Sequence, residues 1–231
     1  MRLFSIIHLM TAITLCSGGE VLQSFHSNDQ RVSVLELYTS EGCSSCPPAD
    51  QWLSQLRNHP DLWTRIIPLS FHVDYWDHLG WKDPYAARAH SDRQRSYAAA
   101  WGSNRIYTPG FVTNGLEGNR QIPGAAQAIG ALSLVQMSDR EWKVSLEAAR
   151  QPQGLRYHVA LLGFDLRSKV TTGENRGRTL VHDFVVLAHL TSPTGTFTLD
   201  TKGAGAVAAW VSSDGNPTPL QATGGWLTNT H

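Results

Sequence analysis

The sequence predicts two units in order, an α/β domain at residues 32–137 and a small all-β, sandwich-like domain at 138–231. In the first unit, an apolar run at residues 32–39 is typical of a strand covered on both faces, and a polar turn leads from it into an amphipathic helix at about 48–58. In the second unit, apolar and polar residues alternate from Glu141 onward, as in half-buried strands. The strands that we expect there lie near residues 142–146, 157–161, 184–188 and 206–211.

The N-terminus has the order of a secretory signal peptide. A basic start at Arg2 precedes an apolar stretch that ends at Leu15, and small residues follow. The apolar stretch is too short for an ordinary membrane-spanning helix, so we expect a signal peptide at 1–19, a polar linker at 20–31 and no spanning segment in the mature chain. Lipid attachment at Cys16 is an alternative, but such signals need a small residue where Leu15 stands. We therefore expect an exported protein, either periplasmic or secreted.

The elements after the first helix follow in the order strand, insertion, hairpin and helix. Because Pro68 cannot donate to a ladder, we expect the strand within residues 62–71 to pair only from Pro68 onward. A loop and a helix are inserted at 72–101. The dipeptide Asn114-Gly115 predicts a hairpin, because both turn positions need positive φ. Apolar residues at helical spacing after Pro123 predict a further helix; they are Ala125, Ala128, Ile129, Leu132 and Val135.

Two cysteines stand at the start of the first helix. Because Cys16 lies in the expected leader, the mature protein carries only Cys43 and Cys46 of the three cysteines. A bridge between them closes so short a loop that it adds little stability, and a helix N-terminus favours a thiolate, so the pattern indicates redox chemistry. Pro47 places the start of the regular helix after Cys43. We expect Cys43 to be the exposed nucleophile and Cys46 the resolving thiol, with metal binding and an inert disulfide as alternatives.

The order of these elements resembles the thioredoxin fold. At higher resolution the chain is similar to a family of exported bacterial proteins, the domain-of-unknown-function family 1223. The segments that carry the resemblance are LELYTSEGCSSCPPAD (residues 35–50), SFHVDYWD (70–77), GWKDP (80–84), RQR (93–95) and YTP (107–109).

The thioredoxin resemblance implies roles for three further residues. It implies that Pro109 is cis, lies beside the cysteines and, with Thr108, shapes a substrate groove, the alternative being an ordinary trans proline at a strand start. It also implies a buried acid behind the cysteines that moves a proton. Glu36, on the strand that leads into the motif, is our candidate for this role, with its pKa raised by burial. A salt bridge or partial exposure of Glu36 is the alternative.

Residues 72–83 are rich in aromatic, acidic and imidazole side chains without a clear period, so we expect a structured loop. Trp76 and Trp81 offer apolar surface, and we expect them to wall the substrate groove. His72 and its acidic neighbours have ligand chemistry, but we assign no metal site to them. The polar turn at 172–178 also fits the family resemblance, and we expect a solvated loop there.

Together these features predict an exported thiol–disulfide oxidoreductase that acts on protein or small thiols. The Cys43–Cys46 pair would carry the electrons itself, so we expect no dissociable cofactor and a thiol- or disulfide-bearing protein as partner. The formal net charge is zero and basic clusters are lacking, so we expect no nucleic-acid partner. Two alternatives remain: a module that handles a soft metal such as Cu(I) through the cysteines, with His72, and a non-catalytic interaction protein with a closed bridge.

Overall fold

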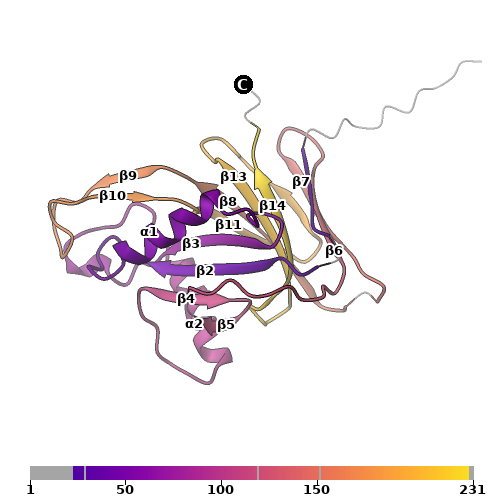
Figure 1. Cartoon of the computed structure of the whole chain (residues 1–231), viewed down its shortest axis with the longest axis horizontal. Helices are drawn as coiled ribbons and strands as arrows, with labels where there is room; N and C mark the ends of the chain where they lie inside the picture. The colour runs from indigo at the N-terminus through magenta and orange to yellow at the C-terminus, as the bar shows by residue number, and fades with distance from the viewer. Residues whose placement is uncertain (1–22, 29, 119, 151, 229–231) are drawn as a thin grey trace, which may run out of the picture.

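The computed structural model describes residues 23–28, 30–118, 120–150 and 152–228, so the expected signal peptide lies outside it. These residues form two α-helices and fourteen strands (Figure 1). The helices are α1 (Pro47–Gln55) and α2 (Arg88–Ala100). The strands are β1 (Ser24–His26), β2 (Ser33–Thr39), β3 (Ile66–His72), β4 (Gly110–Thr113), β5 (Leu116–Gly118), β6 (Ala131–Gln136), β7 (Glu141–Glu147), β8 (Leu155–Gly163), β9 (Leu166–Lys169), β10 (Thr179–His182), β11 (Val185–Ser192), β12 (Thr196–Thr198), β13 (Ala206–Ser213) and β14 (Pro219–Trp226).

Eight of the strands make one mixed sheet, in the order β14-β13-β8-β11-β3-β2-β4-β5. A second sheet has the order β1-β6-β7-β12, and β9 and β10 pair with each other outside both sheets. Within the large sheet β2 and β3 run parallel, and β11 joins β3 in parallel where Val185 lies opposite Ser70. The other neighbouring pairs of this sheet are antiparallel.

The predicted fold class, an α/β thioredoxin-like domain followed by a small all-β domain, is wrong. Strands predominate, and the eight-stranded sheet takes strands from both sides of residues 137 and 138. The large sheet continues across the expected domain boundary because the chain enters β11 directly beside β3, where Ser70 N donates to Phe184 O at 2.8 Å. The helix expected after Pro123 is also wrong, since β6 occupies residues 131–136 with alternate residues buried. Its apolar residues fit a period of two as well as a helical period, and pairing with β1 and β7 decides the outcome. The expected linker at 20–31 contains β1.

The hairpin predicted at Asn114-Gly115 is confirmed, whereas the expected start of pairing at Pro68 is wrong. The turn between β4 and β5 has positive φ at both central residues, 50° at Asn114 and 82° at Gly115. Pro68, however, lies inside β3, which pairs with β2 from Ile66 onward. Ser70 directs its N–H toward β11. The backbone nitrogen of Pro68, two residues earlier, faces the same side because the two sides alternate along a strand. The ladder to β11 begins only at Ser70, so the missing N–H of Pro68 breaks no ladder bond.

Both faces of the large sheet are covered. Leu35 and Leu37 of β2 pack with α1, whereas Tyr38 packs on the opposite face with Tyr97 of α2. The four-stranded sheet covers the α1 face along β8 and β13, where Trp142 packs against Val207, Val211 and their neighbours. Figure 1 shows α1 and α2 on opposite sides of β2 and β3.

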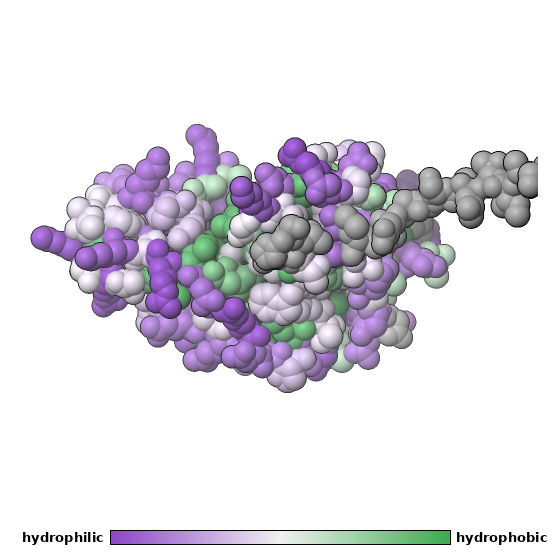
Figure 2. All heavy atoms as spheres, turned by 90° about the horizontal axis from the view of Figure 1, so that it is seen from above, coloured by the Kyte–Doolittle hydropathy of each residue, from purple (hydrophilic) through white to green (hydrophobic). Residues whose placement is uncertain are grey.

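Little of this hydrophobic core reaches the surface. On the face seen in Figure 2, hydrophilic side chains cover most of the molecule, and hydrophobic residues are visible mainly toward the middle. No helix within the described ranges is long and apolar enough to cross a membrane.

A buried ion pair fastens α2 to the sheet. Arg93 donates from Nε and Nη2 to the two carboxylate oxygens of Glu36, each at 2.8 Å. The hydroxyls of Tyr38 and Tyr97 donate to the same carboxylate at 2.7 and 2.6 Å, and the guanidinium lies 5.2 Å from the ring centre of Trp210. Glu36 is fully buried and Arg93 nearly so, so each charge depends on the other groups for its partners.

We expect Arg93→Met to lower the free energy of unfolding by about 3–5 kcal/mol, because it leaves the Glu36 carboxylate buried without a counter-charge. Urea unfolding followed by circular dichroism measures this change. The double variant Glu36→Gln/Arg93→Met should recover part of the loss, because no charge then remains buried. Arg88→Met, on the exposed side of α2, is the control and should change stability by less than about 0.5 kcal/mol. An Arg93→Met loss no larger than that of the control would contradict the role of the ion pair.

Candidate functional site

The two cysteines follow a turn that is buried although it is made of polar residues. Ser40, Glu41, Gly42 and Cys43 have almost no exposed surface. Backbone groups buried in this way need hydrogen-bond partners, and side chains far away in the sequence supply several of them. Glu41 N donates to Asp83 Oδ2 at 2.9 Å, and Asn175 Nδ2 donates to the carbonyls of Glu41 and Cys43 at 2.8 and 2.9 Å. The turn is therefore held by the loop before α2 and by the β9–β10 hairpin.

A disulfide joins Cys43 and Cys46 at the N-terminus of α1. The helix begins at Pro47, as predicted, and Cys43 lies in the preceding turn. The expectation that Cys43 is exposed is wrong, because neither cysteine has exposed surface. Cys43 Sγ lies 3.3 Å from Ser45 Oγ and 3.8 Å from Thr108 O, and Glu174 accepts a hydrogen bond from Ser44 N at 2.9 Å. The chain around the disulfide covers it.

The structure brings the predicted groove residues to this turn. The Thr108–Pro109 bond is cis, as predicted. Trp76 Nε1 donates to Thr108 Oγ1 at 2.7 Å, and Trp81 Nε1 donates to Glu41 Oε2 at 2.7 Å. Gly42 permits the close approach of Trp76, because a Cβ at this position would lie 3.0 Å from the Trp76 Cβ. Trp76 and Trp81 thus pack against the turn, and no open groove separates Trp76 from Thr108.

Glu36 does not join this group. Its side chain faces α2, whereas α1 packs on the opposite face of the sheet beside Leu35 and Leu37. All of its hydrogen bonds go to Arg93, Tyr38 and Tyr97. The structure therefore favours the salt-bridge alternative for Glu36 over a role beside the cysteines.

Asp50 is the buried acid of α1, and the sequence interpretation missed it. Its Oδ2 accepts a hydrogen bond from Thr39 Oγ1 at 3.1 Å and lies 4.0 Å from His182 Nδ1. Burial raises the pKa of Asp50 to about 7, although His182 and the Thr39 hydrogen bond act to lower it. Asp50 follows Cys46 by four residues, so the helical spacing was the signal that could have identified it.

Two buried histidines, each paired with a carboxylate, lie beside Asp50. His72 Nδ1 is 2.7 Å from Asp83 Oδ2, and His182 Nε2 is 3.1 Å from Glu41 Oε1. The two rings meet edge to face with their centres 4.8 Å apart. Burial acts to raise the pKa of Asp83, but His72 and two backbone N–H groups hold it below its ordinary value.

The expectation of a solvated loop at 172–178 is only partly correct. Most of the loop is exposed, but Asn175 is fully buried and braces the cysteine turn from 132 residues away. His182 reaches the same site from β10. No local pattern marks these two residues, because only the packing of β10 against α1 brings them to the turn.

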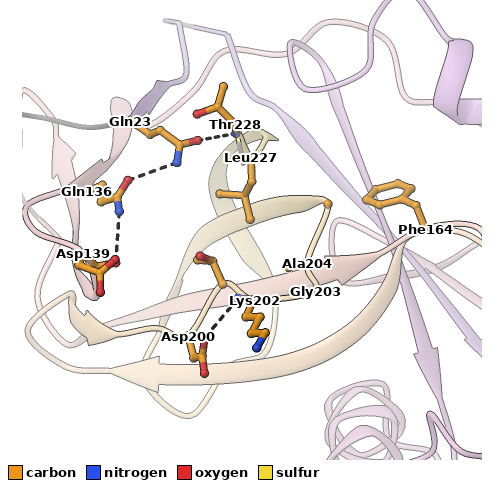
Figure 3. Close-up of a pocket in the computed structure, with 12 residues that line it drawn as sticks. Gln23, Gln136, Asp139, Phe164, Asp200, Lys202, Gly203, Ala204, Leu227 and Thr228 are labelled. Atoms are coloured by element: carbon orange, nitrogen blue, oxygen red, sulfur yellow. Dashed lines mark hydrogen bonds between the residues drawn. The ribbon is translucent and has the colours of Figure 1, made fainter. Parts of the chain in front are cut away.

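The described residues show no metal centre at the cysteines, and the cavity drawn in Figure 3 lies away from them. In the described part of the chain, no group of three or more His, Cys, Asp or Glu side chains could hold a metal ion. A cavity of about 590 Å³ lies where β6, the loop before β13 and the end of β14 meet. Gln23 lies there between Gln136 and Thr228 and is hydrogen-bonded to both (Figure 3). None of the predicted site residues lines this cavity.

Comparison with known proteins decides the family. The family model described as "Protein of unknown function (DUF1223)" matches residues 34–215, which span α1, the disulfide and most of the large sheet. The chain belongs to this family. No curated protein matches the chain. The DUF1223 match includes the segments 35–50 and 70–84, in which the cysteines and the tryptophans Trp76 and Trp81 lie.

Two solved structures resemble this DUF1223 protein. The first is an X-ray crystal structure of a protein from Agrobacterium tumefaciens, with 24% identity, a TM-score of 0.62, and coverage of 87% of this chain and 96% of the other. The second is HBP35 of Porphyromonas gingivalis, with 15% identity, a TM-score of 0.55, and coverage of 87% and 76%. Likeness at these identities shows a shared fold alone.

We expect Asn175→Ala to lower the free energy of unfolding by about 1–3 kcal/mol, because it removes the side-chain donor from the buried carbonyls of Glu41 and Cys43 and leaves the latter with the Cys46 N–H at 3.3 Å. Asn175→Asp should lose at least as much, since a carboxylate would face the same carbonyls. Urea unfolding measures both changes, with the exposed Asn104→Ala as the control. Stability equal to that of the control in both variants would show that the turn does not depend on Asn175.

Proposed function

We propose that this protein is an exported thiol–disulfide oxidoreductase that exchanges its Cys43–Cys46 disulfide with the thiols of a partner protein. The observation that carries the proposal is the disulfide itself, placed at the N-terminus of α1 with a buried carboxyl one turn further on. A bridge that closes so short a loop contributes little to stability, so its chemistry is the better reason for its presence. The positive end of α1 stabilises the thiolate that exchange requires.

Each sulfur has a separate role in this proposal. Cys43 precedes the regular helix, lies between the exposed Ser44 and the Thr108 carbonyl, and is the nucleophile. Cys46 lies at the helix start beside Asp50 and resolves the mixed disulfide. The pair carries two electrons without a dissociable cofactor. Thr108, Pro109, Trp76 and Trp81 form the surface that a substrate meets, once Trp76 has moved from its hydrogen bond with Thr108.

The N-terminal sequence supports the same proposal. The first residues have the order of a signal peptide, and disulfides persist in the oxidising compartments to which such peptides lead. The exchange partner would be a thiol- or disulfide-bearing protein of that compartment.

We expect Cys46→Ser to retain a mixed disulfide at Cys43. After reduction and exposure to oxidised glutathione, Cys43 attacks the disulfide, and the variant has no second thiol to release the adduct. With Cys16 replaced by Ser in every protein compared, mass spectrometry of the unreduced protein should show one glutathione per Cys46→Ser molecule. The wild type should return to the internal disulfide, and Cys43→Ser is the matched control with little adduct.

Other outcomes of this experiment point to the alternatives. A wild-type bridge that resists dithiothreitol in the folded protein, with no adduct on Cys46→Ser, would favour a non-catalytic interaction protein. A stoichiometric soft metal in protein purified without added metal would favour a metal-handling module.

We expect Trp76→Phe to speed reduction of the disulfide by dithiothreitol about two- to tenfold. The change removes one hydrogen bond of about 0.5–1.5 kcal/mol that holds Trp76 on Thr108, while the aromatic ring stays. Thr108→Val removes the other partner and should have the same effect, and the double variant should be no faster than either single one. Trp226→Phe, on the distant strand β14, is the control. Rates in Trp76→Phe, Thr108→Val and the double variant that equal the wild-type rate would show that this contact does not limit access.

A further inference from the structure

An acidic side chain from the β9–β10 hairpin lies on the residue that follows Cys43. Glu174 Oε2 accepts a hydrogen bond from Ser44 N at 2.9 Å. Because Ser44 N is bonded to the carbonyl carbon of Cys43, the carboxylate lies within one residue of the sulfur that the proposed exchange attacks. The two hydrogen-bonded residues are 130 positions apart in the sequence, so the fold of the hairpin places this charge beside the disulfide.

Contacts on both sides of Glu174 hold it at this place. Gly173 has a φ of 74° and passes close to Trp81, where a Cβ on the glycine would lie 3.4 Å from the Trp81 Cβ. Asn175 is fully buried and donates to the Cys43 carbonyl at 2.9 Å. The carboxylate is therefore carried by a fixed segment, although its own side chain is exposed.

The negative charge of Glu174 has no counter-charge beside it. Hydrogen bonds from Ser44 hold the pKa of Glu174 below its ordinary value, so the carboxyl is ionised at neutral pH. Within the described ranges no cation forms an ion pair with it, and Arg178 of the same hairpin donates to Asn175 Oδ1 at 3.2 Å. A molecule that approaches the disulfide from this side meets the full charge of the carboxylate.

We propose that Glu174 gives the disulfide a preference for thiols that carry positive charge near the sulfur, such as a cysteine of a partner protein flanked by lysine or arginine. The inference rests on the proposed function and names the class of thiol that it serves. The attacking group is a thiolate, and its own negative charge is repelled by the Glu174 carboxylate as it nears Cys43. A cationic group beside the thiolate offsets this repulsion, whereas a second negative charge adds to it.

The charge of Glu174 acts on the first step of the exchange. The thiol loses its proton to solvent, and the thiolate sulfur attacks Cys43 to form a mixed disulfide. The Cys43–Cys46 bond breaks, and Cys46 leaves as a thiolate with the electron pair. The attacking sulfur is oxidised to the disulfide level and Cys46 is reduced, while Glu174 keeps its proton state and acts only through its charge.

Three small thiols with the same carbon chain can test this preference without a known partner. Aminoethanethiol ends in a positive group, mercaptoethanol in a neutral one and mercaptoethanesulfonate in a negative one. Each is added in excess, at neutral pH and low salt, to the oxidised full-length protein with Cys16→Ser, and alkylation followed by mass spectrometry records the rate of reduction. This parent protein is compared with Glu174→Gln and with the control Glu141→Gln, whose side chain is exposed on β7 of the four-stranded sheet.

Glu174→Gln keeps a hydrogen-bond acceptor for Ser44 N and removes the charge. The three thiolates carry net charges of zero, minus one and minus two. We therefore expect the variant to leave the aminoethanethiol rate nearly unchanged and to raise the other two, by about two- to fivefold for each negative charge on the thiolate. Each thiol is compared with itself in two proteins, so its intrinsic reactivity cancels. Glu141→Gln should match the parent protein for all three thiols.

The outcomes separate this inference from the proposed function. A parent protein whose disulfide none of the three thiols reduces overturns the proposed function, and the inference falls with it. Reduction by all three thiols, with rates that Glu174→Gln leaves unchanged or raises equally, overturns the inference alone, since equal increases would mean that the side chain only covers the disulfide.

If Glu174→Gln fails to fold, the salt dependence of the parent protein decides. Added potassium chloride screens the charge of Glu174, so it should quicken reduction by mercaptoethanesulfonate more than reduction by aminoethanethiol. An equal response of the two thiols to salt would contradict the charge preference.

Discussion

The rest of the site depends on one constraint, that the turn from Ser40 to Cys43 is buried and its backbone must still be hydrogen-bonded. Neighbouring residues supply only some of these hydrogen bonds, so Asp83 and Asn175 supply further partners from distant segments. These contacts join the loop before α2 and the β9–β10 hairpin to the end of β2. The parallel pairing of β11 with β3 makes the same connection through the sheet.

The two faces of β2 separate two buried acids with different surroundings. Glu36 has a full set of partners, including the fixed positive charge of Arg93, so its carboxylate serves to hold α2 on the sheet. Asp50 lies on the α1 face, has one oxygen without a partner, and is surrounded by groups of both signs. The two acids therefore lie on opposite faces of the sheet, and of the two only Asp50 is near the disulfide.

Sequence patterns predicted what short-range rules control and failed where pairing between distant segments decides. The start of α1 after Cys46 and the Asn114-Gly115 turn are local features, and they are confirmed. The cis bond before Pro109, which the thioredoxin resemblance implied, is confirmed as well. The run after Pro123 fitted two periods, and its partners β1 and β7 made it a strand. The burial of Cys43 and of Asn175 follows from packing across more than 100 residues, which no local pattern contains.

Part of the surface over the disulfide comes from a segment that can change in sequence independently of the two sheets. Glu174 and Asn175 belong to a hairpin whose strands β9 and β10 pair with each other and with neither large sheet. Substitutions at the exposed positions of this hairpin can change the surface over the disulfide while Asn175, the sheet and the cysteine helix stay constant. Two DUF1223 proteins with the same disulfide and the same core can therefore differ, through one short segment, in the surface that covers the disulfide.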